Sequence, residues 1–418
     1  MTTLDGRDAR RARIAVSALF LVNGALIANV LPRLPAIKAQ LDLTNAALGT
    51  AVAAMPVGGL LAGSVTGLLI VRYSSRRVTV GTGVAFGLLL GLIGLAPGWV
   101  ALAASFFVLG MLDAVMDAAM NAHGMVVQRG YGRSILHGFH GWWSLGTLTG
   151  AGMGAVAAAF GVPVFIHLEV VGIILAAVSL AASRLMLRDP DADAAHVRVA
   201  PDGAVVGGAS VGAAPRALRL LRQLAPFALI GVLAVMLEDA ASTWSTIYLT
   251  EVLGVAVGLA ALAVVLFTAG MTVGRLTNDR WIDRWGDAAV ARTGALVASL
   301  GIGLAIAAGW WGAVPLAALG FGLVGLGTAP LFPVMISAAA TVPGIPAGQG
   351  VAVVVWLARG GFVIAPTLVG LAADVVGLGA ALIIPLVAGL TVALLMSSLL
   401  ASSGRHTLPT RGEVILDA

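Results

Sequence analysis

Cysteine is absent from the 418 residues, so the chain forms no disulfide and offers no thiolate to a metal or substrate. The six histidines are scattered, with no HExxH or similar spacing, and we therefore expect no metal site. The sequence also lacks a Walker-type glycine loop and any nucleophile placed beside a base. We expect neither ATP use nor enzymatic activity, and no cofactor.

Charged residues are scarce as well, at 10% of the chain. A soluble domain carries about 25%. Apolar residues reach 59%, and the 55 glycines suit helices that approach closely in lipid. The net charge of +5 does not indicate nucleic-acid binding, because the basic residues gather between apolar segments. This composition indicates a membrane protein with the lipid bilayer as its partner.

Twelve segments are long and apolar enough to cross a bilayer, for which a helix needs about 20 apolar residues. Breakers such as Pro97-Gly98 and Gly161-Val162-Pro163 separate them. We predict an all-α membrane protein with twelve transmembrane helices. The expected ranges are 14–31, 46–71, 78–97, 99–127, 139–161, 163–185, 223–250, 257–277, 288–309, 311–340, 347–373 and 376–401.

The positions of Lys and Arg predict the orientation. With the N-terminus in the cytoplasm, 21 of the 24 fall on the cytoplasmic side. Only Arg33 and Lys38 fall outside, and Arg359 lies within a span. This asymmetry predicts that both termini are cytoplasmic. We expect the protein in the cytoplasmic (inner) membrane. The arginines before the first span then belong to an uncleaved helix rather than to a signal peptide.

A polar connector divides the chain into two halves of six spans. The expected organisation is an N-terminal bundle at 1–185, a cytoplasmic linker at 186–222, a C-terminal bundle at 223–401 and a cytoplasmic tail at 402–418. We expect the linker to end in a short basic helix near Arg216–Arg222.

Basic loops stand at matching places in the two halves and are candidates for gating. The second copy matches a known signature at Asp283-Arg284-Trp285-Gly286, whereas the first has Val71 in place of the acid and Ser74 in place of glycine. The signature resembles that of the major facilitator superfamily of secondary transporters. The candidate gating residues are Arg72, Arg76, Arg77, Arg275, Asp279, Asp283, Arg284 and Gly286.

Further stretches resemble a branch of that superfamily related to sugar permeases, with mostly unassigned substrates. They are Asn23-Gly24, Arg33-Leu34-Pro35, Asp117–Asn121, His140–Gly146, and Glu238 with Trp244 and Tyr248. The resemblance implies two six-helix bundles with a cavity between them, lined by the first, fourth, seventh and tenth spans. It also implies a monomer that works by alternating access.

Acidic residues lie in the middle of two spans, where a carboxylate costs about 2.5–3.5 kcal/mol. Asp113, Asp117 and Asn121 share one face of the fourth span at i, i+4 and i+8. In the seventh span Glu238 and Asp239 point about 100° apart, and we favour Glu238 as the one facing the cavity. Asp117, Glu238 and Asp113 are candidate proton carriers, since burial and nearby cations shift the balance between their charged and neutral forms. The alternative is that such acids form ion pairs that only tie helices together.

The candidate solute-binding residues lie on or near the lining helices. Arg359 is buried in the eleventh span and needs a partner, either an anionic group of the solute or an acid in a static pair. The prolines of the tenth span predict a bend that serves gating or only irregular packing. The residues expected to contact solute are Asn23, Asn121, Trp244, Tyr248 and Arg359.

These observations favour a proton-coupled symporter for a small polar solute. A drug or metabolite efflux carrier of the same fold is one alternative, and a transport-inactive sensor or scaffold is another. Gly146, Gly150 and Gly154 resemble part of an exporter signature, but Ala151 stands where that signature has proline. We therefore expect this glycine run to serve close helix packing.

Overall fold

The computed structural model describes residues 6–131, 135–187 and 214–403, and the regular structure in these ranges is entirely helical. The N-terminal half is continuous from the first helix to a short 3-10 turn. Its elements are α1 (Gly6–Ala28), η1 (Leu31–Arg33), α2 (Leu34–Gln40), α3 (Asn45–Tyr73), α4 (Ser75–Leu89), α5 (Leu92–Leu95), α6 (Trp99–Tyr131), α7 (Leu136–Ala159), α8 (Val164–Ala182) and η2 (Ser183–Leu185).

The C-terminal half contains the longest helix of the described chain, α11, with 50 residues. Short helices precede two of its long ones. Its elements are α9 (Ala214–Glu251), α10 (Val257–Ala260), α11 (Leu262–Trp311), α12 (Val314–Thr328), α13 (Leu331–Ala340), α14 (Ala347–Val376), α15 (Leu378–Ala381) and α16 (Ile383–Ser403).

Ten stretches of the described chain are long and apolar enough to span a membrane. One of them, Val257–Trp311, has 55 residues and is broken at Gly286, where φ is 80° and ψ is 156°, so it forms two spans. The apolar helix α7, with 24 residues, has the length of a further span. The described helices thus accommodate the predicted twelve spans and confirm an all-α membrane protein.

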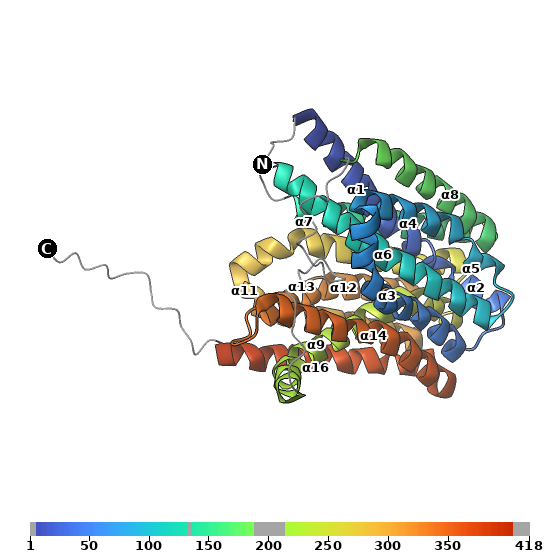
Figure 1. Ribbon diagram of the computed structural model, residues 1–418. Coiled ribbons are helices and arrows are strands. Elements are labelled where there is room, and N and C mark those ends of the chain that lie inside the picture. The colour runs from blue at the N-terminus through green and yellow to red at the C-terminus, as the bar shows by residue number, and fades with distance from the viewer. Residues whose placement is uncertain (1–5, 132–134, 188–213, 404–418) are drawn as a thin grey trace.

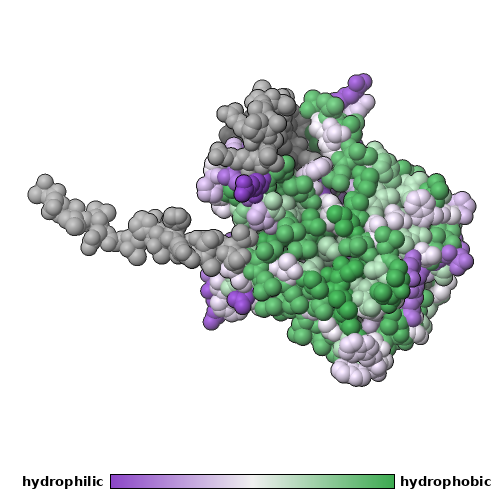
Figure 2. All heavy atoms as spheres, turned by 90° about the horizontal axis from the view of Figure 1, so that it is seen from below, coloured by the Kyte–Doolittle hydropathy of each residue, from purple (hydrophilic) through white to green (hydrophobic). Residues whose placement is uncertain are grey.

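The long helices run side by side, and Figure 1 shows the N-terminal half above the C-terminal half. Figure 2 shows apolar side chains across the middle of one face, with hydrophilic residues gathered toward its two ends. Large apolar residues such as Leu68, Val71 and Leu394 are more than 70% exposed. An exposed apolar belt between polar ends is the surface that a bilayer requires.

Glycines let α1 and α7 approach within the N-terminal bundle. A Cβ added at Gly146, Gly150 or Gly154 would lie 2.1, 2.5 or 2.7 Å from a backbone oxygen of α1 or of the residue just after it. These distances leave no room for a side chain. The predicted packing role of this run is therefore confirmed, and the approach places the middle of α1 directly against α7.

The two bundles contact each other through α3 with α14 and α7 with α11. The contact between α3 and α14 is close, because a Cβ on Gly49 would lie 2.1 Å from the carbonyl oxygen of Pro366. A Cβ on Gly370 would similarly lie 2.5 Å from that of Asn45. The bundles thus meet tightly at the N-terminal end of α3.

Several local expectations are confirmed or corrected. The tenth span is bent as predicted, since α12 ends at Thr328 and α13 begins at Leu331. The basic loop expected after the eighth span is helical instead, because α11 continues to Gly286. The basic stretch Arg216–Arg222 is the beginning of α9 rather than a separate helix. Most of the expected linker and tail, at 188–213 and 404–418, lies outside the described residues.

Candidate functional site

A hydrogen-bonded chain of polar groups crosses the N-terminal bundle at mid-depth. The Nδ2 of Asn23 on α1 donates to Oδ1 of Asp113 on α6 at 2.9 Å. The indole Nε1 of Trp143 on α7 donates to Oδ1 of Asn23, also at 2.9 Å. Asn23 is 3% exposed, whereas Asp113 and Trp143 are half-buried. The asparagine is thus fixed from both sides, and the acid keeps some accessible surface.

The chain continues into the C-terminal bundle through Arg275 of α11. Its guanidinium lies over the ring of Trp143, 4.9 Å from the ring centroid, which is cation–π geometry. Arg275 also interacts electrostatically with Glu238 of α9. Both side chains are half-buried. Next to this contact, Oγ1 of Thr272 lies 3.4 Å from the carbonyl oxygen of Ser144.

The expectation that Arg275 belongs to a cytoplasmic loop is therefore wrong. It lies inside α11, about 16 Å before the break at Gly286 at 1.5 Å per residue. The sequence signal was present, because Arg275 follows an apolar stretch directly. The match to the loop signature led us to place Arg275 among the cytoplasmic gating residues instead.

Arg359 of α14 supplies a second guanidinium, which interacts electrostatically with Asp113. It is half-buried within its helix, as the sequence predicted. Asp113 thus receives a hydrogen bond from its own bundle and faces a positive charge from the other. The network joins six long helices, namely α1, α6, α7, α9, α11 and α14.

The remaining acids are held more locally. Asn121 Nδ2 donates to the carbonyl oxygen and to Oδ1 of Asp117, at 2.9 and 3.0 Å, within α6. Asp239 is 4% exposed, and its Oδ1 accepts a hydrogen bond from Thr243 Oγ1 at 2.8 Å. Glu238 is more accessible than its neighbour Asp239, as expected from their rotation around the helix.

Two residues expected to contact solute are sealed inside the C-terminal bundle. Trp244 and Tyr248 are 0% exposed. The hydroxyl of Tyr248 donates to the carbonyl oxygen of Ala305 at 2.7 Å, and its ring packs edge-on against Phe321. Trp244 lies beside Asp239. In this conformation neither aromatic residue lines a surface between the bundles, which corrects the sequence-based expectation.

A polar clasp closes the bundles at the N-terminal end of α3. We define it as Lys38, Glu251, Asn45 and Asp374. Lys38 forms an ion pair with Glu251 and donates to Oδ1 of Asn45 at 2.8 Å. The carboxylate of Asp374 accepts from the backbone N–H groups of Asn45 and Ala46, at 2.8 and 3.0 Å, and so caps α3 from the other bundle. No pattern in the sequence predicted this clasp.

The basic residues of the two expected loops lie at the end of the molecule opposite to the clasp. Arg76 donates to the carbonyl oxygen of Ser183 at 2.9 Å and so ties the start of α4 to the end of α8. Nearby, the hydroxyl of Ser75 lies 3.1 Å from Nδ1 of the buried His123. Other members of this group are exposed, namely Arg72, Arg77, Asp279, Asp283 and Arg284. These five therefore meet water rather than the polar network.

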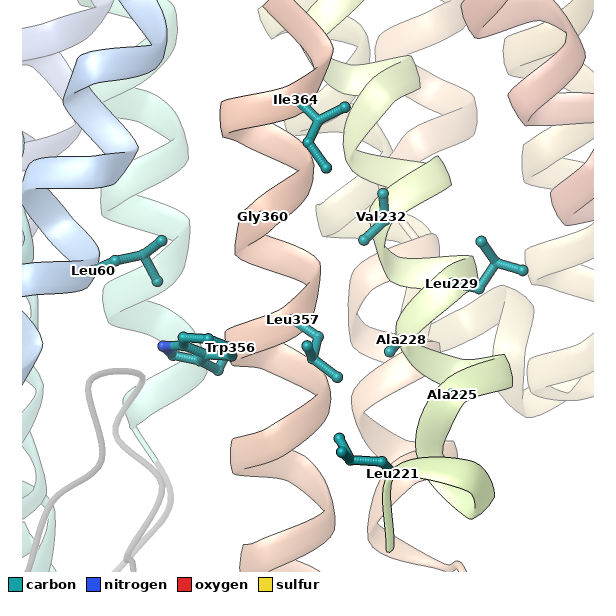
Figure 3. Close-up of a pocket in the computed structure, with 10 residues that line it drawn as sticks. All are labelled: Leu60, Leu221, Ala225, Ala228, Leu229, Val232, Trp356, Leu357, Gly360 and Ile364. Carbon is teal, nitrogen blue, oxygen red and sulfur yellow. The ribbon is translucent and has the colours of Figure 1, made fainter. Parts of the chain in front are cut away.

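A separate apolar groove of about 460 Å³ is lined by residues of α14, α9 and α3. Figure 3 shows Leu60 and Trp356 on one side of α14, and Leu221 and Leu229 toward α9. All ten lining residues are apolar, so the groove offers no group for recognising a polar solute. Among the described residues, no three His, Asp or Glu side chains gather to hold a metal ion.

Two bundles of long apolar helices, with acids and arginines interacting at their middle, form an arrangement typical of membrane carriers. The sequence matches the Major Facilitator Superfamily over residues 16–257, and the chain belongs to this family. It is 31% identical to the transporter y4wD of Sinorhizobium fredii over 88% of this chain and 95% of the relative. It is 29% identical to the membrane protein MosC of Rhizobium meliloti over 91% and 88% of the two chains.

Solved structures show the same fold at low identity. A mutant form of the nucleoside transporter NupG aligns with a TM-score of 0.75 at 12% identity, covering 93% of this chain and 99% of that chain. A bacterial homolog of the human lysosomal transporter Spinster, in an inward-facing and unoccupied conformation, aligns with a TM-score of 0.70 at 12% identity. It covers 97% of this chain and all of the other. The family match and the 31% identity to a transporter show that the protein is a membrane transporter and not an enzyme.

Proposed function

We propose that this transporter is a secondary active carrier that moves a small polar solute together with protons across the cytoplasmic membrane. It works as a monomer by alternating access, with both termini in the cytoplasm. The proposal is carried by one observation, the polar network in which Asp113 interacts electrostatically with Arg359 of the other bundle and Glu238 with Arg275 of its own. Acids at this depth are the groups that proton relays use.

The location of the clasp supports alternating access. It joins the bundles at the end of α3 opposite to Arg72, about 40 Å away along the 29-residue helix. With the arginine-rich end in the cytoplasm, the clasp lies outside. Closure outside combined with partial accessibility of the acids fits a carrier open toward the cytoplasm. In this proposal, rocking of the bundles breaks the clasp and exposes the site to the other side.

Glu238 is the leading proton carrier in this scheme, and Asp113 is the second. A proton on Glu238 removes the charge that faces Arg275 and so changes how the two groups attract each other. Asp117 is the third candidate, and its carboxylate accepts a hydrogen bond from Asn121 within the same helix.

Glu238→Gln in proteoliposomes tests the proposal. The variant is expected to lose uptake driven by a pH gradient and to keep exchange of labelled for unlabelled solute, because glutamine preserves shape but carries no proton. Asp239→Asn is the matched control, since its carboxyl group is sealed beside Thr243. Full pH-driven uptake by Glu238→Gln would exclude Glu238 as the carrier.

The direction of the imposed pH gradient separates uptake from efflux. A symporter accumulates solute when the outside is more acidic, whereas a proton-coupled exporter is driven by the reverse gradient. Flat transport under both gradients for every solute would contradict the carrier proposal.

A further inference from the structure

Two arginines of the C-terminal bundle enter the polar network, and each lies beside an acid. Arg275 faces Glu238 and covers the ring of Trp143, while Arg359 faces Asp113. Both arginines lie inside long helices and remain partly accessible. Charged side chains at this depth are rare in membrane proteins and mark functional sites.

We propose that the solute is a small organic anion with a carboxylate group, and that Arg275 binds this carboxylate beside the face of Trp143. This inference rests on the proton-coupled carrier proposed above and names the chemical class of its solute. A guanidinium presents its N–H donors in a planar fork that matches a carboxylate in two parallel hydrogen bonds.

Charge balance is the first argument for an anion. In the empty site the carboxylate of Glu238 balances the guanidinium of Arg275. A proton taken by Glu238 from the water leaves the guanidinium without its counter-charge, which is costly in a poorly polarisable interior. An arriving carboxylate restores the balance, whereas an uncharged or cationic solute does not. Proton and anion together leave the net charge of the site unchanged while the bundles rock.

The fixed position of Trp143 is the second argument. Its Nε1–H is engaged by Asn23, and Asn23 is in turn bonded to Asp113, so the ring is held in place. The contact between Arg275 and the ring face uses none of the N–H donors of the guanidinium. The arginine is thus positioned by the ring while its donors stay available to a carboxylate.

The pair of Glu238 and Arg275 differs from the pair of Asp113 and Arg359. This difference favours Arg275 as the arginine that binds the solute. The amide of Asn23 stabilises the carboxylate of Asp113 through a hydrogen bond. The charge of Asp113, and with it the attraction to Arg359, therefore resists a proton better than the charge of Glu238 does. Among the described residues, Glu238 has no amide donor of this kind, so its charge is the one that a proton removes more readily. Arg275 is consequently the arginine that changes partners.

Thermal unfolding of the purified full-length protein tests the inference with matched probes. The acids are lactate, glycerate and gluconate, and their uncharged counterparts are lactamide, glycerol and glucitol, each at millimolar concentration and at pH 6 and pH 8. At least one acid is expected to raise Tm, because a bound solute stabilises the folded state. The shift is expected to be larger at pH 6, where Glu238 takes its proton more readily, and the uncharged counterparts are expected to give none.

Variants connect the shift to the proposed residue. Arg275→Gln is expected to abolish it, and Arg275→Lys, which keeps the charge but loses the fork, is expected to weaken binding about 10-fold. Arg292→Gln, at an exposed position of the same helix, is the control and is expected to bind normally. The inference is overturned if no acid gives a shift, if an uncharged counterpart gives an equal shift, or if the shift survives in Arg275→Gln.

Uptake into proteoliposomes separates this inference from the proposed function. If a pH gradient concentrates an uncharged solute, the proposal of a proton-coupled carrier is supported and the proposal of an anionic solute is wrong. If an acid binds through Arg275 but no pH gradient concentrates it, the anion stands and proton coupling is wrong.

Discussion

The two halves of the molecule each place an acid in the middle of the membrane, but they surround it differently. Asp113 in the N-terminal half is bonded to Asn23 of its own bundle and faces Arg359 of the other. Glu238 in the C-terminal half faces Arg275 of its own bundle. This arginine contacts the N-terminal bundle through the ring of Trp143.

This difference suggests a division of labour between the acids. The pair of Asp113 and Arg359 spans the two bundles, so the rocking motion proposed above would change its separation. The pair of Glu238 and Arg275 lies within one bundle, and the same rigid-body motion would leave it intact. A proton site that moves as a unit suits the carrier role, whereas a pair that crosses the interface suits the detection of the bundle position.

The largest expected effect comes from removing one arginine at a time. Arg275→Leu is expected to lower the free energy of unfolding by about 3 kcal/mol, because it leaves Glu238 buried without a counter-charge. Arg359→Leu is expected to cost less, since Asn23 still donates to Asp113. Denaturant unfolding of both purified variants measures the difference. Adding Glu238→Gln to Arg275→Leu should recover part of the loss, and equal losses in the two single variants would contradict the comparison.

A second test breaks the helix contact that holds the N-terminal network together. Gly150→Leu is expected to cost about 2 kcal/mol, because its side chain meets the backbone of α1 at Ala25. Gly152→Leu is the matched control, as a Cβ there has no neighbour within 4 Å. Thermal unfolding checks the effect on stability. Equal melting temperatures for the two variants would show that this contact is not tight.

A third test uses the turns that follow the second and eighth spans. Ser74 (φ 75°, ψ 148°) and Gly286 (φ 80°, ψ 156°) adopt nearly the same backbone conformation, which glycine tolerates and other residues rarely adopt. Ser74→Gly is expected to raise the free energy of unfolding by about 1 kcal/mol, and Gly286→Ser is expected to lower it by a similar amount. Denaturant unfolding measures both, and a destabilising Ser74→Gly would contradict the strain argument.

The smallest expected effect concerns the clasp. Asp374→Asn weakens the cap on α3. It is expected to shift the equilibrium between the closed and open states of the clasp by about 0.5 kcal/mol, or about twofold. Because the chain lacks cysteine, spin labels can be attached at Ala39→Cys and Val252→Cys without background. Pulsed distance measurement should show a broader, longer distribution in the variant. An unchanged distribution would mean that apolar packing alone keeps this end closed.

The apolar pattern of the sequence was sufficient to predict the spans, because each helix must satisfy its own backbone in lipid and must cover the same thickness. Burial of Asp113, Glu238 and Arg359 followed from the same pattern. The partners of these residues did not follow, since they depend on how closely helices from distant parts of the chain approach. Asp113 and Asn23, for example, are separated by 90 residues.

Trp244 and Tyr248 illustrate a different limit. The family resemblance indicated a helix for these residues, but it did not indicate which face of that helix is directed toward the other bundle. Trp244 is six residues after Glu238, which is about 240° of rotation, and it therefore turns into the C-terminal core. The clasp was missed for a related reason. Asp374 and Asn45 are 329 residues apart, and nothing local marks either of them as a cap.

The single-residue joint at Gly286 gives α11 a mechanical property. The spans before and after it follow each other without any connecting segment, since helical geometry resumes immediately on both sides. Such a joint can pivot but cannot lengthen, so an axial displacement of the first span is transmitted directly to the span that follows. In the proposed transport cycle, a solute that moves Arg275 would therefore move the second span of α11 as well.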